Sequence, residues 1–190
     1  LEETVRYAAA TGAHEVRILE PMPTGRLAGS GPDEMLGFEE REALKGFHVR
    51  MNREPGMPKV SVFAHTEDFG CYGCGAGTQH AYIDGGGRLQ PCDFVPLGFG
   101  SVREEPVAAL WARMHRSVDK PRPQCMAMEL NEKGLLAGQS RFPLSPLESS
   151  ACLEALGQCD AMPGFYRDLK GDHSCPPEPE DPGDPKRCQR

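Results

Sequence analysis

Cysteine and glycine recur at fixed intervals across residues 69–111, and this pattern limits the folds that are open to the chain. Cys71 and Cys74 form a C-x2-C pair, and Cys92 follows after seventeen further residues, directly behind a proline. Cys125 comes later, in the sequence RPQC. A short hairpin between Cys74 and Cys92 would fold the chain back on itself and bring these thiols together. Convergent thiolates are typical metal ligands.

The hairpin itself is predicted from the residues between the cysteines. Segments 80–83 and 88–90 flank the sequence Asp-Gly-Gly-Gly at 84–87. Aspartate followed by glycines supplies the positive φ angles that a tight turn requires. Such a turn places Cys74, before the first strand, near Cys92, at the end of the second.

The composition of the 190 residues excludes several classes of protein. The net charge of −7 argues against nonspecific binding to nucleic acid, which needs clustered lysine and arginine. The sequence contains no apolar run long enough for a transmembrane helix and no signal peptide. We therefore predict a cytoplasmic protein with neither nucleic acid nor membrane as a partner.

Eight cysteines are many for such a protein, and their even number also suits disulfides. We favour metal thiolates for the clustered cysteines, because nothing in the sequence indicates export. The remaining four have no assigned role and are interpreted as free thiols: Cys152, Cys159, Cys175 and Cys188.

Hydrophobic periodicity outside the cysteine region predicts an α+β fold. Apolar stripes or capping residues predict helices over 2–11, 39–52 and 106–116, with shorter ones within 126–136 and 147–156. Segments rich in β-branched residues predict strands over 14–19 and 59–64. His48 falls on the apolar stripe of the second helix, so we interpret it as a packed histidine rather than a ligand.

The cysteine region resembles the opening of the SPASM motif, C-x9-15-G-x4-C. Cys74, twelve residues, Gly87, four residues and Cys92 match it in order, and the sequences AYIDGGGRLQPCDF and FGSVREEP are similar to those around the motif. The motif marks the C-terminal extension of many radical SAM enzymes, where it binds an auxiliary iron–sulfur cluster. The resemblance is specific over residues 70–114 and extends more weakly from the N-terminus to about Cys125.

The chain also departs from that family's pattern. It lacks the C-x3-C-x2-C triplet that binds the catalytic cluster, and only Cys125 stands where the full motif continues with C-x2-C-x5-C-x3-C. The chain thus resembles the C-terminal portion of such an enzyme, with ligands for one auxiliary cluster, as in a twitch domain. The segment EVRILEPMPTGR at 15–26 resembles the late barrel strand that lies near the adenine of S-adenosylmethionine.

The resemblance, which reaches to about Cys125, and the composition of the rest together predict four regions. Residues 1–64 would form the last βα elements of a radical SAM partial (β/α) barrel, and residues 65–130 a SPASM/twitch-like domain made of a β-hairpin and a helix. Residues 131–172 would be a C-terminal extension. Residues 173–190 are predicted to be disordered, because a segment rich in proline and acidic residues buries too little apolar surface to offset its ordering entropy.

The resemblance also implies a ligand set and a function. Cys71, Cys74, Cys92 and Cys125 would bind an auxiliary [4Fe–4S] cluster, which needs four ligands. The full-length enzyme would add S-adenosylmethionine and a second [4Fe–4S] cluster, with a reductant such as ferredoxin or flavodoxin. The auxiliary cluster would serve electron transfer or substrate positioning in the radical modification of a peptide or small molecule. This chain alone is predicted not to cleave S-adenosylmethionine.

Two alternatives to the iron–sulfur interpretation would place the chain in other classes of protein. A zinc-binding structural module would need a fourth ligand beside three cysteines, which His65 or His80 would supply. Four-cysteine zinc sites usually use two C-x2-C pairs, and the second pair is absent from this sequence. The other alternative is an interaction module without metal, whose acidic tail contacts a partner. The residues predict no catalytic group.

Overall fold

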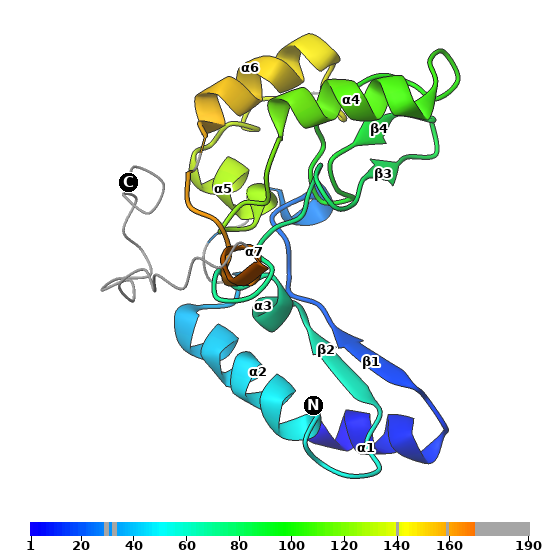
Figure 1. Ribbon diagram of the computed structural model, residues 1–190, viewed down its shortest axis with the longest axis vertical. Helices are drawn as coiled ribbons and strands as arrows, with labels where there is room; N and C mark the ends of the chain where they lie inside the picture. The colour runs from blue at the N-terminus through cyan, green and yellow to red at the C-terminus, as the bar shows by residue number, and fades with distance from the viewer. Residues whose placement is uncertain (29–30, 32–33, 140, 159, 170–190) are drawn as a thin grey trace.

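The computed structural model describes residues 1–28, 31, 34–139, 141–158 and 160–169, and it confirms a mixture of helices and strands (Figure 1). One part contains α1 (Glu2–Ala10), β1 (Glu15–Ile18), α2 (Phe38–Met51) and β2 (Lys59–Val62), and the short η1 (Gly25–Leu27) lies in the connection between β1 and α2. The other part contains β3 (Tyr82–Ile83), β4 (Leu89–Gln90), α4 (Val107–Ser117), α5 (Met126–Glu132) and α6 (Pro146–Leu156). Two short helices lie between these parts in the view of Figure 1: α3 (Phe63–Thr66) and α7 (Gly164–Leu169).

The first part is built on a βαβ unit. Strands β1 and β2 pair in parallel, with Glu15 opposite Lys59 and Ile18 opposite Val62, and α2 belongs to the connection between them. The Asn52 side chain joins the end of α2 to β2, because its amide donates to the Val60 carbonyl at 2.7 Å and its oxygen accepts from the Val60 N–H at 3.1 Å. The core of this part is formed by Val5, Phe47, Met51, Val60, Val62 and Ala64.

The strand predicted over 59–64 is shorter in the structure. It ends at Val62, which pairs with Ile18, the last residue of its partner strand β1. With no further strand backbone to pair with, the chain turns into α3 at Phe63. This short helix was not predicted, and it determines where the residues after it lie.

The second part contains the predicted hairpin. Strands β3 and β4 are antiparallel, with Ile83 opposite Leu89. The Asp84 carboxylate accepts hydrogen bonds from the Gly86 and Arg88 N–H groups at 2.8 and 2.9 Å, and Gly87 has a φ of +84°. These features confirm the turn that the Asp-Gly-Gly-Gly sequence predicts.

The hairpin packs with α4, α5 and α6 around one hydrophobic core. Its fully buried side chains include Leu89, Leu97, Phe99, Leu110, Met114, Met126, Leu130 and Leu156. Met22, which follows β1, belongs to this core and not to that of the βαβ unit. The first part of the chain therefore contributes a side chain to the core of the second.

None of the helices in the described ranges is both long and apolar enough to cross a membrane. The predicted disordered tail at 173–190 lies outside the described residues, as do Cys159, Cys175 and Cys188. Cys152 is described: it is a buried free thiol on α6, 3.9 Å from the Leu135 carbonyl oxygen.

Candidate metal centre

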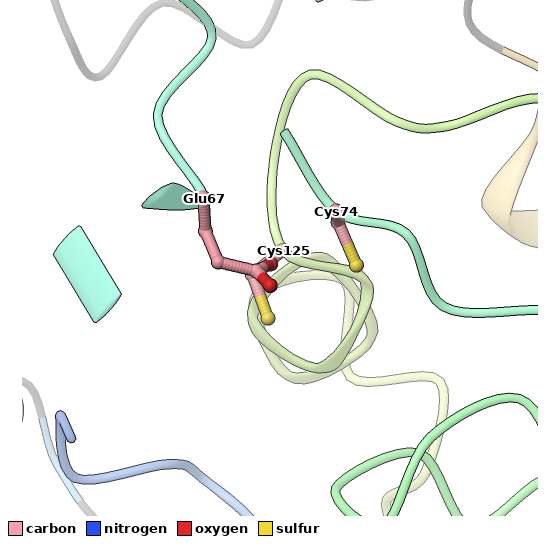
Figure 2. A group of neighbouring side chains, drawn as sticks. All are labelled: Glu67, Cys74 and Cys125. Carbon is pink, nitrogen blue, oxygen red and sulfur yellow. The ribbon is translucent and has the colours of Figure 1, made fainter. Parts of the chain in front are cut away.

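Three side chains that can bind a metal converge beside the N-terminal end of α5. Glu67, Cys74 and Cys125 each offer one ligand atom, and these atoms all lie within 4.8 Å of one another (Figure 2). Glu67 follows α3 directly, Cys74 lies in the loop before the hairpin, and Cys125 is the residue that precedes α5. Both cysteines are buried and Glu67 is partly buried.

These three residues line a small cavity of about 90 Å³. Cys92, at the end of the hairpin, lines the same cavity, and so does His80. The other lining residues are Phe63, Asp93, Phe94, Val95 and Ala127. Three of the four predicted ligands, Cys74, Cys92 and Cys125, therefore line one small cavity.

A backbone contact joins the loop of Cys74 to the segment before α5. The Cys74 N–H donates to the Arg122 carbonyl at 2.8 Å, and the Arg122 N–H donates to the Cys74 carbonyl at 3.0 Å. The Arg122 guanidinium forms a buried two-pronged ion pair with Glu129 on α5, at 2.6 and 3.2 Å. Since Cys125 lies between Arg122 and Glu129 in the chain, the ion pair and the backbone contact together hold Cys125 near Cys74.

Gly73 is necessary for this close approach. It has a φ of +61°, a conformation that residues with a side chain rarely adopt. A Cβ atom at this position would also collide with the Arg122 carbonyl oxygen and with the Pro163 ring. A larger residue would thus separate the two segments that carry Cys74 and Cys125.

Cys71 is placed differently from the other three predicted ligands. It is partly buried, and it belongs neither to the group within 4.8 Å nor to the residues that line the cavity. Its N–H donates to the Asp68 carbonyl at 2.9 Å, and its carbonyl accepts from the Phe165 N–H of α7 at 3.0 Å. The assignment of Cys71 as a ligand remains a prediction.

The two histidines considered for a zinc site also differ. His80 lines the cavity, whereas the His65 ring stacks on His48 with 3.9 Å between the ring centroids. This stacking agrees with the prediction that His48 packs against other side chains instead of binding a metal. The sequence does not single out Glu67, because a glutamate within the polar segment TEDFG has no spacing that distinguishes it from a solvated residue.

Burial and the hydrogen bond between two of the thiols govern the protonation of the site. Burial, with the Cys74 thiol next in effect, raises the pKa of Glu67 to about 8. Burial raises the pKa of Cys92 to about 12. A hydrogen bond between Cys74 and Cys125 lowers the pKa of Cys74 to about 7 and raises that of Cys125 well above its usual value. At neutral pH Glu67, Cys92 and Cys125 therefore hold their protons, which a bound metal would displace.

Residues 74–127 match the SPASM family model, which is described as an iron–sulfur cluster-binding domain. The matched segment begins at Cys74 and contains Cys92 and Cys125. The chain therefore carries an iron–sulfur domain of the SPASM type.

Two curated relatives are similar to a larger share of the chain. Both are named AdoMet-dependent heme synthase. The protein of Methanosarcina barkeri is 23% identical over 144 residues, which cover 64% of this chain and 41% of the relative. That of Nitratidesulfovibrio vulgaris is 27% identical over 123 residues, covering 54% of this chain and 34% of the relative. These matches and the SPASM domain support a protein of the radical SAM/SPASM type.

The aligned regions span less than half the length of these relatives. No solved structure gives a significant match to the chain.

Proposed function

We propose that the chain is the C-terminal portion of a radical SAM enzyme and binds one auxiliary [4Fe–4S] cluster. The observation that carries this proposal is the convergence of Cys74, Cys92 and Cys125 around one cavity, within the segment that matches an iron–sulfur domain. A [4Fe–4S] cluster is held mainly by cysteine thiolates, so this donor set fits it. Residues 65–130 are the proposed twitch-like domain.

The βαβ unit supports the assignment of residues 1–64 to the end of a (β/α) barrel. Parallel strands with a helix in the crossover are the repeating unit of such barrels, and catalytic groups in them lie beyond the carboxyl ends of the strands. Phe63, which begins α3 after β2, lines the metal cavity. The proposed extension at 131–172 shares the core of the cluster domain through Leu144, Cys152 and Leu156.

The chain's own residues would bind the cluster and shield it from water. Phe63 and Phe94 line the cavity and meet edge to face, with 6.4 Å between their ring centroids. A bound cluster supplies one-electron chemistry, and burial is one of the factors that set its reduction potential. We propose that it serves electron transfer from a ferredoxin or flavodoxin, or positions a peptide or small-molecule substrate. Because both relatives are named heme synthases, haem synthesis is the first small-molecule reaction to test.

Anaerobic reconstitution tests the cluster assignment directly. With iron and sulfide supplied, the chain should bind about four iron and four sulfide ions and become brown, as expected for one [4Fe–4S] cluster. Metal and acid-labile sulfide assays on the desalted protein measure this. A colourless protein with tightly bound zinc would favour the zinc module, and a protein without metal would favour the interaction module.

The reconstituted chain is expected to release no 5′-deoxyadenosine from S-adenosylmethionine in the presence of dithionite. The reason is that these 190 residues lack the C-x3-C-x2-C triplet whose three thiolates hold the catalytic cluster. Chromatography of the quenched reaction measures the product. An amount clearly above that of a protein-free reaction would contradict the prediction and would assign catalysis to the auxiliary site.

A further inference from the structure

The cavity contains three of the four predicted cysteine ligands, and a carboxylate lies at the same place. Glu67 offers an oxygen within 4.8 Å of both the Cys74 and the Cys125 sulfur, whereas Cys71 does not line the cavity. We propose that Glu67, in place of Cys71, is the fourth protein ligand of the auxiliary cluster. This inference rests on the proposed function, since it identifies a ligand of that same site.

The backbone of Glu67 is fixed in a position that suits this role. Its N–H donates to the Phe63 carbonyl at 2.9 Å, so Glu67 closes the turn of α3 directly after β2. From there its side chain lies beside the two thiols (Figure 2). The parallel strand and the short helix after it therefore deliver an oxygen donor to a site whose thiols come from the hairpin region and from α5.

Cys71 is held by contacts to a different element. Its carbonyl accepts from Phe165, and the Phe69 carbonyl accepts from Gly164 at 2.8 Å, so this loop is hydrogen bonded to α7. The Tyr72 ring also lies 4.7 Å from the Phe165 ring, centroid to centroid.

The chemistry of the donor fits an iron site. Iron–sulfur clusters accept ligands other than cysteine at individual irons, and such a replacement changes the reduction potential. Iron also binds carboxylate oxygen in other proteins. One iron held by Glu67 would therefore differ from the three held by thiolates. We expect it to be released more readily on oxidation.

The test compares four variants with the wild-type chain after anaerobic reconstitution, by iron content and by electron paramagnetic resonance of the reduced and air-oxidised protein. Cys71→Ser should keep the wild-type iron content and spectrum. Glu67→Gln should lose about a quarter of the iron or more, that is, at least one of the four ions of the cluster. Glu67→Cys should restore the iron and give a changed spectrum. Asp68→Asn makes the same carboxylate-to-amide change one residue away and should have no effect.

Loss of iron in Cys71→Ser would overturn this inference, whatever the Glu67 variants do. Wild-type iron and an unchanged spectrum in Glu67→Gln would overturn it as well. Where Glu67→Gln fails to fold, as judged by circular dichroism, Glu67→Cys decides: a changed spectrum supports Glu67 as a ligand and an identical one refutes it. A wild-type chain without a cluster would instead refute the proposed function, so the two failures are distinguishable.

Discussion

Replacement of Cys92 with alanine is expected to remove most of the iron from the reconstituted chain. Cys92 lies two residues after β4 and lines the metal cavity, so its loss removes the thiolate that the hairpin region contributes. Iron and sulfide assays, with the visible absorbance, measure the effect. Cys152→Ala is the matched control, because Cys152 is also a free thiol of the second core but does not line the cavity.

A stability measurement distinguishes a lost ligand from a misfolded protein. In the metal-free chain Cys92 is protonated at neutral pH, since burial raises its pKa to about 12. The alanine variant therefore removes a neutral thiol and should change the free energy of unfolding of the metal-free protein by only about 1 kcal/mol. Wild-type iron content in Cys92→Ala would show that Cys92 is not a ligand, and His80, which lines the same cavity, would be the next residue to test.

The hairpin and its cysteines were predictable because the signal is local. The Asp-Gly-Gly-Gly sequence specifies a tight turn, and the spacing of Cys74, Gly87 and Cys92 follows from that turn. The convergence of Cys125 with them was predictable only from the family resemblance. The spacing alone cannot show it, because it depends on the pairing of Arg122 with Cys74 across a long connection.

Glu67 and the environment of Cys71 depend on tertiary contacts that leave no pattern in the sequence. The strand β2 ends where its partner β1 ends, and the helix α3 that follows turns Glu67 toward the thiols. The loop of Cys71 is bonded to α7, almost a hundred residues later in the chain. Neither the end of a strand pair nor the docking of a distant helix can be derived from residue spacing.

The charged residues on either side of Cys125 also could not be assigned to the site from the sequence alone. In the sequence PRPQCMAMEL, an arginine and a glutamate separated by six residues resemble ordinary surface charges. In the structure Arg122 and Glu129 are buried, with side-chain exposures of 11% and 5%. Their position between the loop of Cys74 and α5 makes this ion pair a part of the framework of the site.

Replacement of Glu129 with alanine is therefore expected to destabilise the metal-free protein by about 3–5 kcal/mol, because it leaves the Arg122 charge buried without its carboxylate. Denaturant unfolding followed by circular dichroism measures the change. Glu132→Ala is the matched control: Glu132 lies on the same helix, is exposed and accepts from Gln124 at 3.1 Å, so its loss should cost at most about 0.5 kcal/mol.

The double variant Arg122→Met, Glu129→Leu removes both charges but keeps apolar side chains at both positions. It therefore distinguishes the electrostatic effect of the ion pair from the effect of lost packing. Removing both charges avoids a buried charge that has lost its counter-charge, so it should recover most of the stability lost in Glu129→Ala. It also keeps the backbone pairing of residue 122 with Cys74, which does not depend on the side chain. The double variant should thus retain its iron. A loss below about 1 kcal/mol in Glu129→Ala would contradict the prediction, and it would mean that the backbone contact alone holds Cys125 beside Cys74.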